Sequence, residues 1–390
     1  MDKIRVFTAF SGYDSQCLAL DRLKSSFPNF DYDLVGWSEI DKYAIQAHNA
    51  LFPQWAERNY GDISKIDWSQ VPDFDLFTYS SPCQDFSNAG LQRGGEEGSG
   101  TRSSLLWECR KAIIAKRPKY LILENVKALV SKKFLPTFNK WIQDLEDYGY
   151  YNTWQVLNAK DYGVPQNRER VFLISIRRDL LDPEPSYYFP KPFPLQDRLK
   201  DVLEENVDEK YYLSDKKIDY MKRTSSGGIQ HGKGIRTLND ETCGTIMAVA
   251  QLKTGGGSGI IKGRLVIMKP IEIYGLSRSR DKQGKVVKRS LNDYVNCLHT
   301  QVGSARDNME VYVMETNTKM RIRKLTPREC FRLMGVDDAD IGKIQASGIS
   351  NSQQYKCAGN SIVVDVLYHL FRKMFVEKGS EEATYQQVLF

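Results

Sequence analysis

Hydrophobic and polar positions divide the first 180 residues into short apolar runs separated by longer amphipathic stretches. Segments such as Leu105–Ala115 and Leu135–Asp147 repeat their apolar positions with a helical period. The short runs are typical of buried strands and occupy Ile4–Phe10, Leu34–Ser38, Phe74–Tyr79, Tyr120–Glu124 and Val171–Ile176. Strands that alternate with helices predict an α/β domain, a doubly wound parallel sheet covered on both faces.

A proline-rich segment ends this pattern. Residues 182–194 contain five prolines, which rule out a helix or a central strand and indicate a stiff connection. Residues 225–310 are rich in glycine, serine and threonine and indicate an irregular, β-rich second domain. The sequence therefore predicts a catalytic domain over residues 1–185 and a smaller β-rich domain over residues 186–351.

Helical signals return after Arg323. Thr326 has the properties of an N-cap, Pro327 of a first helical residue and Glu329 of the acid of a capping box. The apolar run Asn360–Phe371 is compatible with a strand or a helix. We expect residues 352–390 to form a segment that packs back on the first domain.

Composition narrows the class of protein. The chain of 390 residues is 41% hydrophobic and contains no apolar run of membrane length, and its start enters a strand pattern directly, so neither a membrane span nor a secretory signal is expected. Seven cysteines without CxxC spacing favour a reducing, cytoplasmic setting over a disulfide framework. Four histidines, none paired at ligand spacing, give no reason to expect a metal site.

The formal net charge of +6 points toward polyanionic partners. Six basic side chains crowd the stretch from residue 278 to 289, with only Asp281 against them. On charge alone, a solvated face and a nucleic-acid contact explain this stretch equally well.

The triplet Pro82-Cys83-Gln84 follows the third predicted strand. Ligands and reacting groups collect at the carboxyl ends of strands in open α/β sheets. A half-buried thiol is the commoner fate of a single cysteine. A cysteine behind a rigid proline and ahead of the glycine-containing run from Asn88 to Gly100 nevertheless indicates a nucleophile on a loop.

Three further strand ends carry small or acidic residues. Phe10-Ser11-Gly12 is a small-residue turn of the kind that holds nucleoside cofactors, Glu39 ends the second strand, and Asp62 follows Gly61. Each acid alone would more often be a helix N-cap or a solvated carboxylate. Together they favour a nucleoside ligand.

Two more groups of residues carry chemistry. Glu124 follows four apolar residues, so we expect a partly buried carboxyl group with a raised pKa. In the run from Gln166 to Arg170, strand alternation would put Gln166, Arg168 and Arg170 on one face. Guanidinium groups bind phosphate or base carbonyls, and ion pairs with Glu169 would explain the run equally well.

In this order the motifs resemble those of the DNA (cytosine-5) methyltransferases. The matching segments are Phe10-Ser11-Gly12, Pro82-Cys83-Gln84, Glu124-Asn125-Val126, Gln166-x-Arg168-x-Arg170, Arg323 to Cys330 and Gly359-Asn360-Ser361. The chain departs from the family at Tyr13-Asp14-Ser15, where the family usually has more glycines. Residues 190–320 match no motif, and in this family they form the target-recognition segment.

The resemblance implies a Rossmann-like domain that binds S-adenosylmethionine and a reaction at C5 of a flipped-out cytosine. Cys83 would add to C6, Glu124 would hydrogen-bond N3, and Arg170, with Arg168 near it, would hold O2 or a flanking phosphate. The implied cofactor contacts are Phe10, Gly12, Glu39, Asp62, Ile63, Pro82, Leu105, Asn360 and Ser361. The expected partner is double-stranded DNA, contacted by Ser87, Gln166, Arg278, Arg280, Lys288, Arg289, Gln301 and Arg306.

Such an enzyme would be a cytoplasmic, bacterial or phage-encoded monomer, with or without a cognate restriction endonuclease. Three alternatives remain at this stage. A tRNA cytosine-5 methyltransferase would have a more compact middle region, and an exocyclic-amino methyltransferase would need a polar-Pro-Pro-aromatic motif in place of Ser81-Pro82-Cys83-Gln84. A silent DNA-binding homologue would not need Cys83, Glu124 and Arg170 together.

Overall fold

A computed structural model describes residues 3–81, 102–180, 187–214 and 323–377 of the chain, with side chains from residue 105 onward in the second range. It also gives the backbone of four short strands between residues 237 and 315. Within these ranges, no helix is both long and apolar enough to cross a membrane.

The core of the protein is a six-stranded sheet with the order β2-β1-β3-β4-β7-β5. All five predicted strands are present, and their bounds are β1 Ile4–Ala9, β2 Tyr32–Ser38, β3 Leu76–Tyr79, β4 Tyr120–Val126 and β7 Glu169–Arg177. β1 to β4 pair in parallel, but β7 runs antiparallel to β4, so the expectation of a wholly parallel sheet is wrong.

The sequence does not reveal the strand β5 (Tyr150–Asn158), which pairs antiparallel with β7 at the edge of the sheet. Its middle positions are only half-buried and include Asn152 and Gln155. An edge strand of this composition lacks the continuous apolar run that makes the central strands visible.

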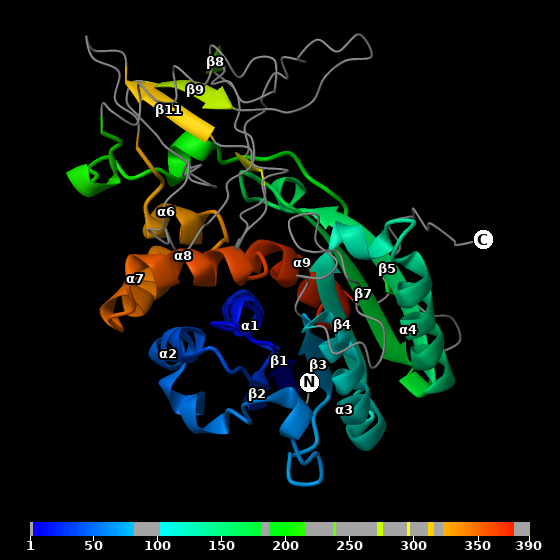
Figure 1. Ribbon diagram of the computed structural model, residues 1–390. Coiled ribbons are helices and arrows are strands. Elements are labelled where there is room, and N and C mark those ends of the chain that lie inside the picture. The colour runs from blue at the N-terminus through cyan, green and yellow to red at the C-terminus, as the bar shows by residue number, and fades with distance from the viewer. Residues whose placement is uncertain are drawn as a thin grey trace, which may run out of the picture.

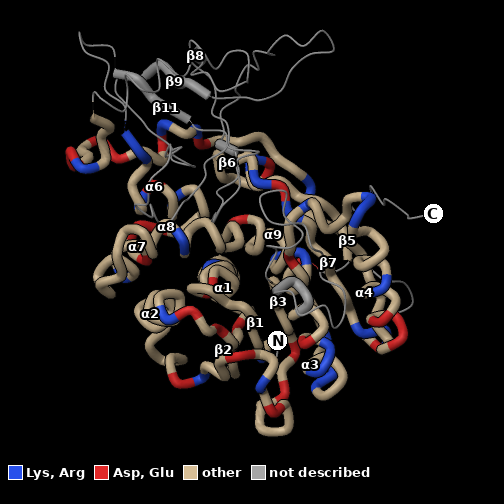
Figure 2. The backbone as a smooth tube through the Cα atoms, in the orientation of Figure 1, with Lys and Arg blue, Asp and Glu red and all other residues tan. Residues whose placement is uncertain are grey.

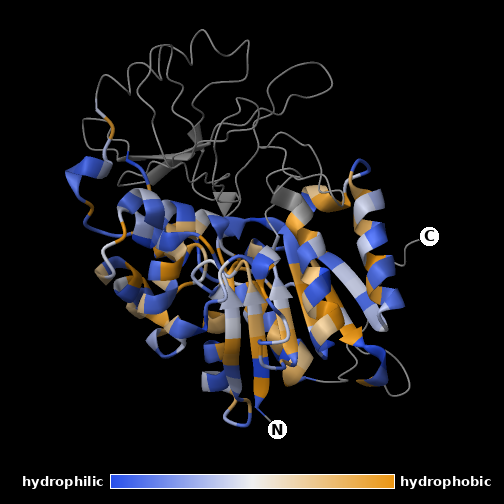
Figure 3. Cartoon of the chain, turned by 60° about the horizontal axis from the view of Figure 1, so that its bottom comes forward, coloured by the Kyte–Doolittle hydropathy of each residue, from blue (hydrophilic) through white to orange (hydrophobic). Residues whose placement is uncertain are grey.

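Helices cover both faces of the sheet (Figure 1). One face packs against α1 (Ser15–Ser26), α2 (Lys42–Leu51) and α9 (Val364–Phe375), and the other packs against α3 (Cys109–Lys116) and α4 (Leu135–Asp147). Successive residues of β1 point to opposite faces, since Val6 joins the first cluster of buried side chains and Phe7 the second. Figure 3 shows hydrophobic residues concentrated along these strands. The doubly wound arrangement is confirmed.

The predicted helix Leu135–Asp147 is found with those bounds, whereas Leu105–Ala115 divides into the 3₁₀ helix η3 (Arg102–Glu108) and α3. Short elements complete the described chain. They are η1 Pro53–Arg58, η2 Ile63–Lys65, η4 Lys127–Val130, η5 Ala159–Asp161, β6 Gln166–Asn167, η6 Arg178–Leu180, η7 Leu199–Val202 and η8 Glu209–Tyr211.

The C-terminal part of the chain closes the first face of the sheet. It consists of α6 (Pro327–Arg332), α7 (Asp338–Ala346), α8 (Asn351–Asn360) and α9. The capping box at α6 is confirmed, because Thr326 Oγ1 accepts from the Glu329 amide at 3.2 Å and the Glu329 carboxylate accepts from the Thr326 amide at 2.7 Å.

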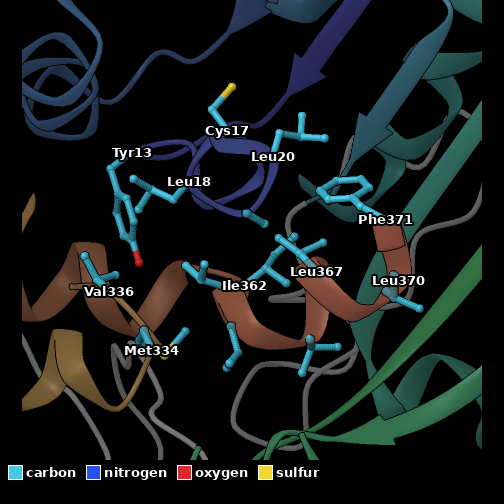
Figure 4. Close-up of a cluster of buried hydrophobic side chains, with 14 of the residues drawn as sticks. Tyr13, Cys17, Leu18, Leu20, Met334, Val336, Ile362, Leu367, Leu370 and Phe371 are labelled. Carbon is cyan, nitrogen blue, oxygen red and sulfur yellow. The ribbon is translucent and has the colours of Figure 1, made fainter. Parts of the chain in front are cut away.

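Residues 323–351 differ from the prediction. The sequence assigns them to the β-rich domain, but Leu325, Phe331 and Ile341 belong to the same buried cluster as Val6 of β1. In Figure 4 the side chain of Tyr13, just before α1, points toward Val336 and Met334, whereas that of Cys17 points away from them. α7 packs against α2, and Phe331 of α6 makes an edge contact with the ring of Tyr13, which precedes α1.

The proline-rich connection also packs on the core. Tyr187 is buried and its hydroxyl donates to Leu370 O at 3.2 Å, and Tyr162 donates to Pro190 O at 2.8 Å. Residues 187–214 thus stay with the first domain, and the predicted boundary at residue 186 is too early. Tyr212, near the end of this range, forms an isolated antiparallel bridge with Arg323, where the next long described range begins.

The predicted β-rich domain lies mostly outside the described residues. Its described strands are β8 Thr237–Leu238, β9 Ile271–Gly275, β10 Val295–Asn296 and β11 Val311–Glu315. β11, β9 and β8 form an antiparallel sheet, and β10 pairs with β6. Figure 2 shows acidic and basic residues interleaved over the described chain. The basic stretch from residue 278 to 289 is outside it, as are Gln301 and Arg306, and target recognition by this segment stays a prediction.

Candidate active site

The carboxyl ends of β1, β2, β3 and β4 meet at one edge of the sheet because these strands are parallel. The segments that follow them are Phe10–Gly12, Glu39–Asp41, Ser80–Ser81 and Lys127–Val130. Glu124 lies two residues before the end of β4. The predicted site residues that follow different strands therefore face one edge, as the sequence indicated.

The turn after β1 is held by Glu39. Gly12 has a φ of 61°, in the left-handed region, and its amide donates to Glu39 Oε2 at 3.0 Å. Glu39 Oε1 accepts from the amides of Ile40 and Asp41, each at 2.8 Å. A Cβ atom at Gly12 would meet no atom within 4 Å among the described residues, so this side of the turn is open.

Asp14 adopts, after the β1 turn, a backbone conformation that usually favours glycine. It adopts a left-handed conformation with φ 67°, which aspartate tolerates better than most residues. Its carboxyl group accepts from the Cys17 amide at 3.2 Å, which caps α1, and from Thr8 Oγ1 at 2.7 Å. Burial raises the pKa of Asp14 to about 7. His48 Nε2 lies 3.7 Å from the same carboxyl group, and burial lowers the pKa of His48 to about 4.

Asp62 is a helix cap in this structure. Its Oδ1 accepts from the Ser64 amide at 3.0 Å and from Ser64 Oγ at 2.8 Å, and these bonds lower the pKa of Asp62. Ile63 is buried below it. The N-cap interpretation left open by the sequence is therefore the one observed, and contact with an adenine amino group stays a prediction.

Glu124 and Arg170 form an ion pair at the end of β4. Arg170 Nε lies 3.0 Å from Glu124 Oε1, and the two side chains are 11% and 7% exposed. Ser80 Oγ donates to the other oxygen, Glu124 Oε2, at 2.6 Å. Glu169 pairs instead with Lys127 at 2.8 Å, so an ion pair between Arg170 and Glu169 does not account for the motif.

Asn125 joins the ends of β3 and β4. Its Nδ2 donates to Ser81 O at 3.2 Å, and its Oδ1 accepts from the Val126 amide at 2.9 Å. Pro82, Cys83 and Ser87 lie outside the described residues. Cys83 follows Ser80 by three positions in the sequence.

Gln166 and Arg168 contact the C-terminal segment. Gln166 is fully buried and donates to Leu333 O at 2.5 Å. Arg168 is 3% exposed and its Nη2 donates to Gly359 O at 3.2 Å and to Ser361 O at 2.6 Å. In this structure both side chains are bound to the C-terminal segment, and the expected DNA contact of Gln166 and catalytic role of Arg168 stay predictions.

Strand pairing is interrupted between β6 and β7, so the three alternate residues do not form one face: Gln166 and Arg168 contact the C-terminal segment, and Arg170 contacts Glu124. Arg170 alone of the three lies beside Glu124.

The remaining predicted cofactor residues lie in three places: the turn after β1, η3 and the end of α8. Phe10 is half-buried with φ 55° and Leu105 is half-buried. Asn360 is exposed at the end of α8, and the carbonyl of Ser361 is held by Arg168. The assignment of these residues to a cofactor site stays a prediction.

Sequence reasoning missed Ile40 and Ser80. Ile40 follows Glu39 and is 72% exposed, the highest value among the exposed large hydrophobic side chains of the described residues. An apolar residue directly after a strand-ending acid was the available signal. Nothing in the order Tyr79-Ser80-Ser81 indicates which of the two hydroxyl groups meets Glu124.

The profile of the C-5 cytosine-specific DNA methylase family matches residues 4–376. The chain belongs to this family. It is 35% identical over 423 residues to the type II methyltransferase M2.ScrFI of Lactococcus lactis subsp. cremoris, covering 95% of this chain and 99% of the relative. It is 32% identical to the orphan methyltransferase M.SPRI of Bacillus phage SPR, covering 98% of this chain and all of the relative.

Solved structures support the methyltransferase fold. The Entamoeba histolytica methyltransferase EhMeth has a TM-score of 0.61 at 17% identity, covering 97% of this chain and 99% of that one. A putative DNA modification methyltransferase encoded within an E. coli prophage has a TM-score of 0.55 at 17% identity, covering 96% and 99%. The resemblance to the DNA (cytosine-5) methyltransferases, inferred from six motifs, is confirmed, and the chain is an enzyme of that family.

Proposed function

We propose that this enzyme transfers a methyl group from S-adenosylmethionine to C5 of a cytosine in a short sequence of duplex DNA, through a covalent bond between Cys83 and C6. Family membership supports the reaction type. The observation that carries the proposal is the cluster of Ser80, Glu124 and Arg170 at the strand end from which the Cys83 segment starts.

The turn after β1 fits a nucleoside methyl donor. A carboxylate offers about four acceptor positions, and Glu39 uses three of them for backbone amides, so one position on Oε2 remains for a hydroxyl group. The open side of Gly12 and the exposed side chain of Ile40 lie next to that carboxylate. We assign Phe10, Gly12, Glu39, Asp62, Ile63, Pro82, Leu105, Asn360 and Ser361 to the donor site.

Cys83 provides the nucleophile. Its thiolate forms an Sγ–C6 bond, and the electrons of the C5–C6 double bond make C5 nucleophilic. S-adenosylmethionine supplies the electrophilic methyl group, and S-adenosylhomocysteine leaves. Loss of the proton from C5 and cleavage of the Sγ–C6 bond then regenerate the thiolate. A paired base cannot reach the site, so the target cytosine has to be flipped out, at a cost of a few kcal/mol.

Glu124 and Arg170 act on the ring. Addition of the thiolate places negative charge on the pyrimidine, and a hydrogen bond from the carboxyl group of Glu124 to N3 stabilises it. Arg170 holds Glu124 in place through the 3.0 Å ion pair and is positioned to contact O2 or a flanking phosphate. Arg168 supports the site indirectly, because it fixes the Gly359–Ser361 turn.

DNA binding is assigned to residues outside the described part of the chain. Ser87 and the basic or amide side chains Arg278, Arg280, Lys288, Arg289, Gln301 and Arg306 are the proposed contacts. A monomeric state, a cytoplasmic location and a cognate restriction endonuclease remain predictions.

Nucleoside mass spectrometry tests the proposed function. Unmethylated plasmid DNA and unmodified tRNA are incubated separately with the protein and S-adenosylmethionine, with Cys83→Ser as control. We expect 5-methylcytosine in the DNA with the wild type and none with the variant. Methylation of tRNA alone would favour the RNA enzyme, and no product on either substrate would favour the silent DNA-binding homologue.

A further inference from the structure

We propose that Ser80 is a positioning residue whose hydroxyl group fixes the orientation of the Glu124 carboxyl group. The inference rests on the proposed function, in which Glu124 hydrogen-bonds the target base, and it assigns to that reaction a residue that no motif of the chain indicates.

The two oxygens of Glu124 have separate partners on different strands. Oε2 accepts from Ser80 Oγ at 2.6 Å, directly after β3. Oε1 faces Arg170 Nε at 3.0 Å, in β7. Glu124 itself lies in β4. The three neighbouring strands β3, β4 and β7 therefore contribute one group each.

Both partners are needed to define the plane of the carboxyl group. The terminal torsion of a glutamate side chain is broad and roughly two-fold, so one hydrogen bond leaves the group free to rotate. A hydrogen bond at one oxygen and an ion pair at the other remove that freedom. Without the Ser80 hydroxyl, Arg170 alone would hold Oε1, and Oε2 would no longer point in one direction.

Serine differs from arginine in what it does when Glu124 gains a proton. A guanidinium group only donates, whereas a hydroxyl group both donates and accepts. Ser80 donates to the carboxylate, it can accept from a protonated Oε2 when no base is bound, and it can donate to the remaining lone pair of Oε2 while the proton is shared with N3. The contact therefore survives a change in the protonation state of Glu124, and the orientation of the group is kept through the reaction.

Ser80 also connects Glu124 to the nucleophile, since it precedes Cys83 by three residues. Its strand end is rigid. Tyr79 is buried, stacks on Phe77 and accepts from Trp141 Nε1 at 3.1 Å. A single hydroxyl group on a fixed strand end thus orients the acid relative to the segment that carries the thiol.

A purely structural role for the hydroxyl group would be to tie β3 to β4. That tie exists without Ser80, because Asn125 Nδ2 donates to Ser81 O and the two strands pair over Leu76–Tyr79. We therefore expect Ser80→Ala to fold, with a melting temperature close to that of the wild type.

The experiment compares Ser80→Ala, Ser80→Thr and Ser175→Ala in steady-state methylation of duplex DNA. Ser175 is a buried serine of β7 whose hydroxyl has no hydrogen-bond partner among the described residues, so its variant removes the same atom away from Glu124. We expect Ser80→Ala to lower kcat about tenfold, the effect of one lost hydrogen bond, and to leave KM for both substrates within about twofold. Ser80→Thr should recover most of kcat, and Ser175→Ala should match the wild type.

A double-mutant cycle separates action through Glu124 from other effects. In a Glu124→Gln background, measured in single turnover, Ser80→Ala should change the methylation rate less than about twofold. An equal tenfold loss in both backgrounds would overturn the inference, as would an unchanged kcat or an unfolded Ser80→Ala protein. A wild type that methylates DNA with any of these results leaves the proposed function intact, whereas an inactive wild type overturns both.

Discussion

The two halves of the site hold their acidic side chains in different ways. At the ends of β1 and β2, Glu39 and Asp62 accept hydrogen bonds from backbone amides, three for Glu39 and one for Asp62. At the ends of β3 and β4, Glu124 is held by two side chains, Ser80 and Arg170. Backbone donors are fixed by the local fold, whereas side-chain donors depend on single residues far apart in the chain.

This difference has a functional consequence. A binding site for a methyl donor needs acceptors in a constant position, and amides of turns and helix ends provide them. A catalytic carboxyl group has to change its hydrogen bonds or its proton during the reaction, and side-chain hydroxyl and guanidinium groups allow that. Substitutions in the β3–β4–β7 half should therefore affect kcat, and substitutions in the β1–β2 half should affect KM.

The largest effect is expected for Glu124→Gln. The amide is of similar size and cannot supply a proton as an acid does, so kcat should fall about 100- to 1,000-fold, within the range of general acid–base catalysis. Rapid-quench methylation assays measure this loss. A KM for S-adenosylmethionine that rises by the same factor would contradict the division of the site into two halves.

Arg170→Lys is expected to be less severe. It keeps the charge but loses the planar Nε–H that faces Glu124 at 3.0 Å, so kcat should fall about 10- to 100-fold. Arg168→Lys is the matched variant within the same motif. Because Arg168 holds the Gly359 and Ser361 carbonyls, its loss should lower the melting temperature and raise KM for the methyl donor more than it lowers kcat. Identical kinetic profiles for the two variants would contradict their separate positions.

Glu39→Gln tests the first half of the site. The amide keeps one acceptor oxygen and puts an NH₂ group where the second oxygen was, so it faces backbone N–H donors on one side. We expect KM for S-adenosylmethionine to rise about tenfold, the effect of one or two hydrogen bonds, with kcat within about twofold. Isothermal titration calorimetry without DNA should show a similar rise in the dissociation constant of the methyl donor. An unchanged dissociation constant would contradict the assignment of Glu39 to the donor site.

Asp14→Asn should have the smallest effect, on stability. The pKa of Asp14 in the folded protein, about 7, is above its value in the unfolded chain. The Asp14 carboxyl group therefore contributes most to stability below about pH 4, and this contribution is lost as the pH rises toward about 7. One proton limits this slope to about 1.4 kcal/mol per pH unit. Asparagine does not titrate and also tolerates the left-handed conformation. Urea unfolding between pH 4 and 7 should show a shallower decline for the variant, and parallel curves would contradict a buried, protonated Asp14.

Local patterns in the sequence predicted most of the fold. Apolar runs gave β1 to β4 and β7, and Thr326-Pro327-Arg328-Glu329 gave the start of α6. β5 was missed because its polar, half-buried positions carry no strand signal. The position of residues 323–351 was not predicted, because it depends on contacts such as that of Phe331 with Tyr13 and that of α7 with α2, about 300 residues away in the sequence.

The candidate site also combines features that follow from local sequence with contacts between distant residues. Strand-ending acids and the Gly12 turn are local features that can be read from the sequence, because each directly follows an apolar run. Which member of Gln166, Arg168 and Arg170 meets Glu124 depends on the break between β6 and β7 and on the C-terminal segment, neither of which alternation describes. The Ser80–Glu124 hydrogen bond joins residues 44 positions apart and had no signal at all.

The central claim is that Cys83 forms a covalent bond with the cytosine it methylates. DNA in which 5-fluorocytosine replaces cytosine throughout tests it directly, because the methylated ring then carries no C5 proton and cannot release the thiol. With S-adenosylmethionine present, we predict that mass spectrometry after nuclease and protease digestion finds a methylated fluoropyrimidine on the peptide that contains Cys83. No adduct on that peptide, together with wild-type methylation of ordinary DNA by Cys83→Ser, would contradict the account.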